Sequence, residues 1–362
     1  MTDKLKVLEF FSGIGAFRQG LINQNIEHEV SGISEYDKYA IKSYNAMFGE
    51  TENFGDITKI KSVPKSDFWT YGFPCQDISI AGNQKGIKEG TRSGLLLEFE
   101  RILESVVVSN EQPKMLLMEN VKNLVGKRHK PDFDGWLKKL DDLGYNSYYQ
   151  VLNTKNYGLP QNRERVFCLS IKKEIDKKGF DFPKKQELKL RLKDILEDKV
   201  SEKYYLKKEQ CENLIRNKKL GQKILESEIN QIGMLDIKGN RQAKVLIKNA
   251  TKKGYLEAFN GDGIDLAYPD SKTRRGRVQP QRSHTLTTSD NLGVLTDFRI
   301  RKLLPIEVWR LQGFSDEQFA KAEEVCSNTR LYKQAGNTIS VNVLEAIYKQ
   351  MVKFGYLKKL EV

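Results

Sequence analysis

The stretch KVLEFFSGIGAF, residues 6–17, passes from an apolar run directly into a glycine-rich turn. Residues 6–11 have the length and composition of a short buried strand, and residues 16–25 have the pattern of a helix. Glycine between a strand and a helix allows the backbone to approach a ligand at the helix N-terminus. The spacing of Gly13 and Gly15 is shorter than in the GxGxxG dinucleotide motif, so a tight turn without a ligand is the alternative.

The alternation of strands and helices continues to about residue 175. Further strands are expected at 27–36, 68–74, 113–121, 147–154 and 163–171. Helices are expected between them at 37–49, 92–107 and 133–144. Short strands that alternate with helices predict an α/β fold, with a mostly parallel sheet and helices on both faces.

The pattern changes in the second half of the chain. Residues 181–297 are lysine-rich, with scattered Gly, Asn and Asp and short β-like runs, which predicts a smaller and more irregular second domain. Helical character returns at 303–314, and residues 334–357 open with a Gly-Asn turn and continue as a helix. We therefore assign residues 1–180 plus 325–362 to the first domain and 298–324 to a hinge and connecting segment.

Composition restricts the partners. The net charge of +13 arises from 61 Lys and Arg against 48 Asp and Glu, which favours a polyanionic partner such as nucleic acid. The four cysteines are scattered and the histidines number three, so neither a metal site nor a disulfide framework is expected. No apolar run has the length of a membrane span and no signal-peptide pattern is present, so we expect a cytoplasmic protein without membrane contact.

Polar side chains follow the expected strands. Glu35 and Tyr36 end the second strand, where an acid can accept ribose hydroxyls and an aromatic ring can cover an adenine. Asp56, in GDI (55–57), could receive an adenine amino group. With the glycine turn, these residues predict a nucleoside cofactor without requiring a pyrophosphate.

Four further residues suggest chemistry at the same edge of the sheet. Cys75 follows Gly-Phe-Pro at a strand end; it could be a small core residue, but its setting favours a thiolate nucleophile. Glu119 closes an apolar strand, where a carboxylate is costly without a partner or a role. Arg163 and Arg165 share one face of a strand, and a surface salt-bridge face is the alternative.

In their order these motifs resemble the DNA (cytosine-5)-methyltransferase family of bacterial or phage restriction–modification type. FFSGIGA (10–16) is similar to its cofactor loop, although Ala16 stands where many members have glycine. SEYDKYA (34–40) and GDI resemble the ribose- and adenine-contact motifs, GFPCQDIS (72–79) the Pro-Cys catalytic loop and MENVKNL (118–124) the Glu-Asn-Val motif. QNRERVF (161–167) resembles the Gln-x-Arg-x-Arg motif, and TLT (285–287), RKLLPIEVWRLQGF (301–314) and QAGNTISVNV (334–343) resemble the elements within and after the recognition region.

The resemblance implies a Rossmann-like methyltransferase sheet, with a catalytic and cofactor-binding first domain and a β-rich target-recognition domain. Cys75 would attack C6 of a flipped cytosine, Glu119 would contact N3 and the exocyclic amine, and Arg165 would hold the O2 edge. Arg163 would support the site and a nearby phosphate, and Asn120 would brace the loop. The cofactor would be S-adenosylmethionine, with S-adenosylhomocysteine as product, bound by Phe11, Gly13, Gly15, Glu35, Tyr36, Asp56, Ile57, Pro74, Leu95, Asn337 and Ile339.

The implied partner is double-stranded DNA, bound by a monomer, with a separate cognate restriction endonuclease left open. The candidate DNA contacts are Gln76, Ser79, Arg92, Arg241, Lys272, Arg274, Arg275, Arg277 and Arg282. The glycine- and lysine-rich segment after Cys75 is expected to close over the DNA, and a solvated loop is the alternative. Two other functions stay open: a tRNA methyltransferase of the same family, and a DNA-binding protein without catalysis. The target site cannot be read from the sequence.

Overall fold

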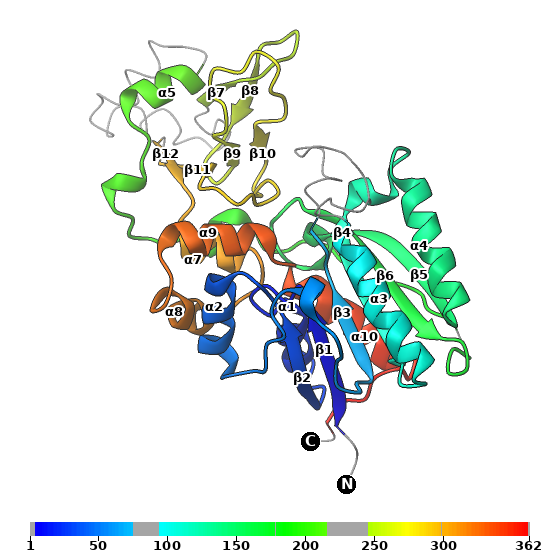
Figure 1. Ribbon diagram of the computed structural model, residues 1–362. Coiled ribbons are helices and arrows are strands. Elements are labelled where there is room, and N and C mark those ends of the chain that lie inside the picture. The colour runs from blue at the N-terminus through cyan, green and yellow to red at the C-terminus, as the bar shows by residue number, and fades with distance from the viewer. Residues whose placement is uncertain (1–3, 75–93, 178, 216–244, 298, 361–362) are drawn as a thin grey trace.

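The computed structural model describes residues 4–74, 94–177, 179–215, 245–297 and 299–360. Within these ranges the chain forms a larger lobe around a six-stranded sheet and a smaller lobe of short antiparallel strands (Figure 1). The cysteine expected to act as nucleophile, Cys75, lies outside the described residues.

The sheet of the larger lobe confirms the predicted α/β fold class. Its strands are β1 (Leu5–Phe10), β2 (His28–Ser34), β3 (Phe68–Tyr71), β4 (Met115–Val121), β5 (Tyr145–Asn153) and β6 (Glu164–Lys172). Their order is β2-β1-β3-β4-β6-β5, and the first four are parallel to one another. β6 runs antiparallel to both of its neighbours, because the short connection from β5 to β6 has no room for the crossover that a parallel pair requires.

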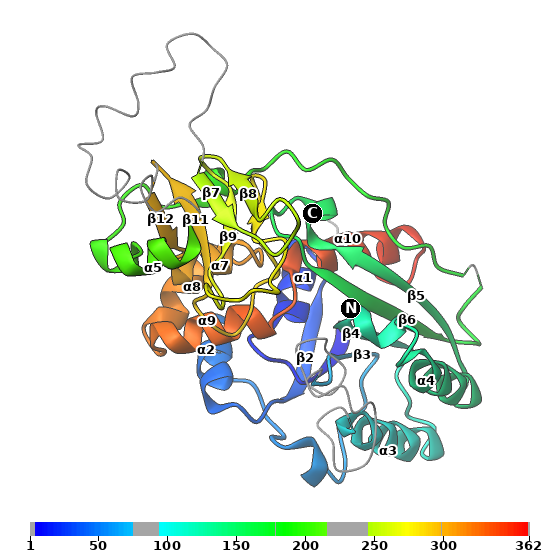
Figure 2. The same cartoon turned by 90° about the horizontal axis from the view of Figure 1, so that it is seen from above.

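Helices cover both faces of this sheet. They are α1 (Ala16–Asn23), α2 (Lys38–Phe48), α3 (Leu95–Val108), α4 (Lys130–Asp142) and α10 (Val341–Lys353). Along β4, Met115 and Leu117 belong to the core shared with α1 and α10, whereas Leu116 and Met118 belong to the core shared with α3 and α4. Successive strand residues point to opposite faces, so one apolar strand serves two cores, and α10 and α4 lie on opposite sides of the sheet (Figure 2).

The smaller lobe has its own core. Its elements are α5 (Lys208–Leu214), β7 (Val245–Lys248), β8 (Tyr255–Ala258), β9 (Gly263–Asp265), β10 (Val278–Gln279), β11 (Leu292–Thr296) and β12 (Arg299–Lys302). β10, β9, β11 and β12 form one antiparallel sheet, while β7 and β8 form a hairpin. The domain limits at residues 181, 297 and 324 stay predictions. The strand β12, which follows residue 297, pairs with β11 of the smaller lobe, and Leu192, which follows residue 181, packs in the core of the larger lobe.

Three helices connect the lobes: α7 (Pro305–Arg310), α8 (Asp316–Glu323) and α9 (Asn328–Asn337). Gly336 and Asn337, expected in a turn before the last helix, lie instead in the final turn of α9, and α10 begins four residues later. Arg301 and Glu307 form an ion pair at 2.7 Å with both side chains buried. This pair fixes the start of α7 to the last strand of the smaller lobe.

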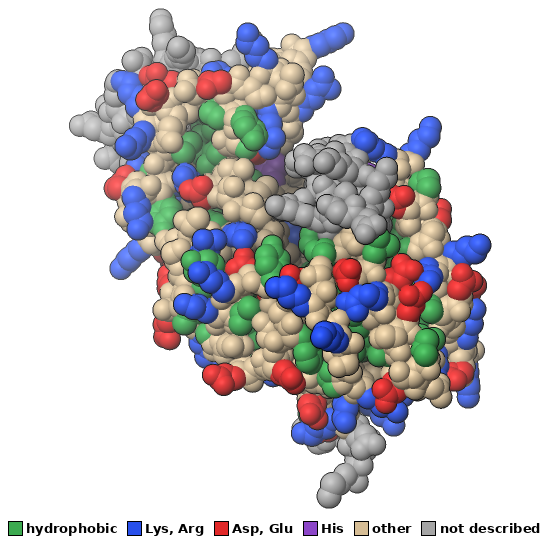
Figure 3. Space-filling view, in the orientation of Figure 1, with side chains coloured by type: hydrophobic (Ala, Val, Ile, Leu, Met, Phe, Trp, Pro, Cys, Tyr) green, Lys and Arg blue, Asp and Glu red, His purple; other side chains and the backbone are tan. Residues whose placement is uncertain are grey.

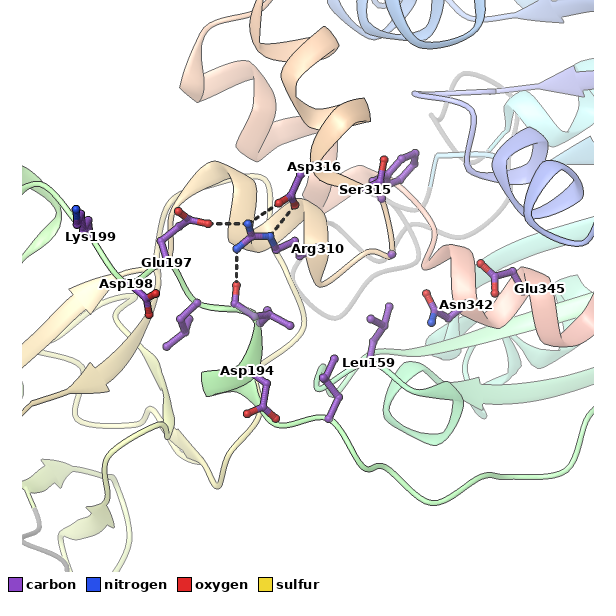
Figure 4. Close-up of a pocket in the computed structure, with 15 residues that line it drawn as sticks. Leu159, Asp194, Glu197, Asp198, Lys199, Arg310, Ser315, Asp316, Asn342 and Glu345 are labelled. Atoms are coloured by element: carbon purple, nitrogen blue, oxygen red, sulfur yellow. Dashed lines mark hydrogen bonds and ion pairs between the residues drawn. The ribbon is translucent and has the colours of Figure 1, made fainter.

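A hollow of about 810 Å³ marks the joint between the lobes (Figure 4). Arg310 crosses it, with its guanidinium 2.6 Å from a carboxylate oxygen of Glu197 and 2.7 Å from one of Asp316. It also donates to the carbonyl of Ile195 at 2.9 Å. These contacts hold the segment that leads into the smaller lobe against α7 and α8, so we interpret this hollow as part of the joint.

Candidate active site

A second cavity, of about 470 Å³, lies at the carboxyl ends of β1 to β4, where ligands gather in open α/β sheets. Its lining combines residues from the glycine turn after β1, the ends of β2, β3 and β4, and α9 from Arg330 to Asn337. On the surface, the molecule is hollowed between the two lobes, and Lys and Arg side chains gather over α9 on the larger lobe's rim (Figure 3).

The glycine turn forms one wall of this cavity. Phe11 and Gly13 have positive φ angles of 54° and 56°, so the chain turns sharply directly after β1. The Gly13 amide donates to Glu35 Oε2 at 2.9 Å, and Glu35 Oε1 accepts from the amides of Tyr36 and Asp37 at 2.9 and 2.8 Å. Burial raises the pKa of Glu35. A Cβ at Gly13 would meet no atom within 4 Å, so the space next to this turn is open for a ligand.

Most of the residues predicted to bind a cofactor line the cavity. These are Phe11, Gly13, Glu35, Tyr36, Asp56, Ile57, Pro74, Leu95 and Asn337. Gly15 and Ile339 lie elsewhere. A Cβ at Gly15 would come within 2.6 Å of Phe48 and 2.8 Å of Tyr44, so this glycine allows α1 to start against α2. Ile339 is buried in the core of the larger lobe.

Among the cavity residues that were not anticipated are two cations from α9, Arg330 and Lys333. Arg330 places its guanidinium 4.0 Å from the ring centroid of Tyr39, and Lys333 Nζ lies 2.6 Å from Asp37 Oδ2. Both line the cavity from α9. Their spacing of three residues, with Asn337 four residues further, puts them on one helical face, and this signal was present in the sequence.

The other end of the cavity holds the predicted catalytic carboxylate. Glu119 ends β4 and is 9% exposed. Arg165 Nε lies 3.1 Å from Glu119 Oε1, an ion pair without hydrogen-bond alignment; within the described residues that oxygen has no hydrogen bond. Burial raises the pKa of Glu119, and the charges of Arg165 and Arg163 lower it by less. The site therefore holds a buried carboxyl group with a raised pKa that is paired with Arg165 but has one oxygen without a hydrogen bond among the described residues.

Asn120 fixes the end of the adjacent strand. Its Nδ2 donates to the carbonyl of Phe73 at 3.0 Å, and its Oδ1 accepts from the amide of Val121 at 2.8 Å. The chain continues from Phe73 through Pro74, which lines the cavity, to Cys75. Cys75, together with the predicted DNA contacts Gln76, Ser79, Arg92 and Arg241, lies outside the described residues.

Arg163 is a structural junction. It is 3% exposed, and it donates to the carbonyls of Leu286, Gly336 and Thr338 at 3.3, 3.2 and 2.8 Å. One guanidinium thus joins the start of β6, the 285–287 element and the end of α9. These contacts fit the expected support of the site but leave this buried group poorly placed for the phosphate contact that we also expected.

The arginines of the smaller lobe that were predicted to contact DNA differ in their exposure to solvent. Arg275 is exposed, and Arg274 is bound to Asp265 at 2.6 Å while remaining partly open to solvent. Arg282 is partly buried, with its Nε donating to the carbonyl of Pro280 at 3.3 Å. Arg277 is 1% exposed and donates to three backbone carbonyls, so its expected contact with DNA is replaced by a role inside the protein.

The other acidic, histidine and cysteine side chains of the described residues form no metal cluster. In the described ranges, no cluster of three or more His, Cys, Asp or Glu could hold a metal ion. Cys168, Cys211 and Cys326 are buried free thiols, and burial raises the pKa of Cys168 to about 12, which keeps it protonated. Among the same residues no helix is both long and apolar enough to cross a membrane.

Comparisons with known proteins agree with this geometry. A family model described as C-5 cytosine-specific DNA methylase matches residues 5–353. The type II methyltransferase M2.ScrFI of Lactococcus lactis subsp. cremoris is 36% identical, over 96% of this chain and 99% of that protein. The orphan methyltransferase M.SPRI of Bacillus phage SPR is 32% identical, over 96% and 98%. The structure of the Entamoeba histolytica methyltransferase EhMeth has the same fold, with a TM-score of 0.62, 18% identity, and coverage of 98% and 99%.

Proposed function

The chain belongs to the C-5 cytosine-specific DNA methylase family, and on that premise we propose that it transfers a methyl group from S-adenosylmethionine to C5 of cytosine in duplex DNA. The observation that supports this most directly is one cavity with two chemically different ends. Its glycine turn and Glu35 suit a nucleoside, and its Glu119–Arg165 pair suits the polar edge of a pyrimidine.

Cys75 is the proposed nucleophile. Its thiolate forms a bond from Sγ to C6 of cytosine, and the electron pair of the C5–C6 double bond becomes available at C5. S-adenosylmethionine, when bound, supplies an electrophilic methyl group that C5 accepts. Loss of the C5 proton then restores the double bond, and Sγ leaves with the electron pair of its bond to C6.

Glu119 is the proposed proton donor to N3. Attack at C6 places electron density on the ring, and a proton delivered to N3 stabilises that density. Because burial raises its pKa, Glu119 can carry this proton closer to neutral pH than an exposed glutamate can. Arg165, which lies 3.1 Å from Glu119 Oε1, is proposed to hold the O2 edge of the base.

The residues of the other end fit a nucleoside cofactor. Glu35 is the proposed ribose partner, since it already fixes the glycine turn, and Asp56 and Tyr36 line the same wall. Asp56 Oδ1 accepts from the amide and hydroxyl of Thr58, so its other carboxylate oxygen is the one proposed to meet an adenine amino group. The open space at Gly13 leaves room for the ligand.

The proposed partner is duplex DNA, with the target cytosine rotated out of the helix to reach the cavity. The net charge of +13 supports a polyanionic partner. One relative is named a type II methyltransferase and another an orphan methyltransferase. A monomeric state and a cytoplasmic location remain part of this proposal.

The test is conversion sequencing of unmethylated plasmid DNA after incubation with protein and S-adenosylmethionine. Cytosines protected within one short recurring motif are expected. Cys75→Ser and Glu119→Gln should lose this protection and still bind S-adenosylhomocysteine in calorimetry, while Glu164→Gln, on the same strand as Arg165 but exposed, should keep it. Methylation by Cys75→Ser would refute the covalent route, and competition by tRNA instead of duplex DNA would move the proposal to an RNA substrate.

A further inference from the structure

The loop between β9 and β10, residues 266–277, presents an unusual tyrosine. Tyr268 is 74% exposed, although large aromatic side chains are normally covered. Its φ angle is 49°, in the left-handed region that a residue with a bulky side chain rarely adopts. Such backbone strain concentrates at functional sites because the surrounding structure must hold it in place. Exposure and strain therefore coincide at one residue.

A buried arginine holds this conformation. Arg277 Nη1 donates to the carbonyls of Asp265 and Ala267 at 3.1 and 2.9 Å, and Nη2 donates to the carbonyl of Tyr268 at 2.5 Å. Arg277 is 1% exposed, so its charge is removed from water and its donors hold three carbonyl groups of this backbone. The loop is preorganised, which lowers the entropy lost when it binds a partner.

One cationic group lies next to the exposed ring, and two more lie on the same loop. The guanidinium of Arg274 lies 5.7 Å from the ring centroid of Tyr268, and Asp265 holds that guanidinium at 2.6 Å. Lys272 and Arg275 are exposed on the same loop. An aromatic ring among cations is the combination that binds nucleic acid, because bases stack on the ring and phosphates bind the charges.

The loop is linked to the active-site cavity through the residues around His284. Its Gly276 carbonyl lies 2.7 Å from His284 Nε2. The residues on either side of His284 bind the larger lobe: the Ser283 amide donates to the carbonyl of Pro160 at 2.7 Å, and the Thr285 hydroxyl to that of Asn162 at 2.6 Å. Asn162 directly precedes the buried Arg163, so a short chain of contacts connects the loop to the catalytic cavity.

From this arrangement we propose that Tyr268 contacts the DNA duplex by stacking its ring on a base beside the target cytosine. The inference rests on the proposed function and adds a positioning residue to it. A cytosine that leaves the helix exposes the faces of neighbouring bases, and a rigid aromatic ring can cover such a face. Tyr268 would thereby stabilise the opened duplex while the cytosine occupies the cavity.

Three variants and one control test this. Tyr268→Ala and Tyr268→Gly remove the ring, Tyr268→Phe keeps it, and Tyr149→Ala removes an exposed tyrosine from β5 in the larger lobe. Because glycine accepts a positive φ without strain, Tyr268→Gly should fold at least as stably as the wild type, which separates loss of binding from loss of structure. DNA affinity is measured by fluorescence anisotropy with duplexes that carry the protected motif.

Tyr268→Ala and Tyr268→Gly should weaken DNA binding about tenfold or more, the effect of losing one aromatic–base stack. The dependence of affinity on salt should keep the wild-type slope, since no phosphate-binding charge is lost. 2-Aminopurine at the target position should show less fluorescence gain, which reports less base extrusion. Tyr268→Phe and Tyr149→Ala should match the wild type, and all variants should bind S-adenosylhomocysteine equally.

Wild-type affinity and base extrusion in Tyr268→Gly would overturn the inference, while methylation by the wild type would leave the proposed function standing. An equal loss in Tyr268→Phe would also overturn it, because the hydroxyl and not the ring would then make the contact. If the wild type bound DNA without methylating it, the proposed function would fail, and the anisotropy comparison on a duplex that the wild type binds would still decide the role of Tyr268.

Discussion

Glu9 on β1 gives the most quantitative prediction that the structure allows. The side chain is fully buried, with Oε1 accepting from the amide of Arg18 at 3.0 Å and Oε2 from the hydroxyl of Tyr44 at 2.6 Å. Burial raises the pKa of Glu9 from its ordinary value of 4.5 to about 7, against smaller opposite effects of Tyr44 and Arg18. The carboxyl thus connects the first turn of α1, directly after the glycine turn, to α2.

The sign of the pH effect follows from proton binding. Between pH 4.5 and about 7, folded Glu9 holds a proton that the unfolded chain has released, so its contribution to stability is complete below pH 4.5 and is lost as the pH rises to about 7. The step from 4.5 to about 7 corresponds to about 3 kcal/mol, since one pKa unit is worth about 1.4 kcal/mol. Most of this loss falls between pH 5 and pH 8.

Glu9→Gln keeps the shape of the side chain and removes its ionisation. Urea denaturation of both proteins at pH 5, 6, 7 and 8 gives the difference in unfolding free energy at each pH. We expect this difference to move by about 2 to 3 kcal/mol in favour of the variant between pH 5 and pH 8. Glu111→Gln, at an exposed position, should show no such movement. Parallel profiles for the wild type and Glu9→Gln would refute the reasoning.

The remaining predictions concern packing, buried charge and salt. Gly336→Ala should lower the melting temperature and raise KM for DNA, because its Cβ would lie 2.2 Å from the carbonyl oxygen of Thr287. Gly135→Ala, on the open face of α4, should instead raise the free energy of unfolding by about 0.5–1 kcal/mol. Equal shifts in melting temperature for the two variants would contradict this. Arg301→Ala breaks a fully buried ion pair and should lower the free energy of unfolding by about 3–5 kcal/mol in urea denaturation. Arg299→Ala breaks a more exposed ion pair and should lower it by less than about 1 kcal/mol. DNA affinity should fall steeply with salt in a titration, and a flat response would count against phosphate contacts.

Much of the fold was predictable because its signals are local. Each expected strand of the larger lobe exists, since apolar runs of about six residues between turns have few alternatives. The antiparallel direction of β6 was not predicted, because the number of residues between β5 and β6 decides it and the apolar pattern does not. Helices α8 and α9 were also not predicted as separate elements.

The cavity likewise combines residues that could be predicted from the sequence with residues that could not. Residues that follow a strand, such as Glu35 and Glu119, line it because carboxyl ends of parallel strands meet at one edge. Gly15 and Ile339 also belong to the cofactor motifs, but they do not line the cavity. Gly15 packs against α2, and Ile339 lies in the core of the larger lobe. Arg277 looked like its neighbours Arg274 and Arg275 in the sequence, and only the folded loop shows that its donors are used inside the protein.

By itself the sequence determined the order of strands and helices from β1 to β6, the family, and the residue types available for the chemistry, because these depend on periodicity and on motifs within short segments. Tertiary structure decided which charged side chains are buried, as for Glu9, Glu119 and Arg163, and which aromatic ring stands exposed on the smaller lobe, as for Tyr268. The pKa of a carboxyl group and the accessibility of a side chain depend on neighbours from segments far apart in the chain. Folding brings these neighbours together, and no local sequence pattern contains them.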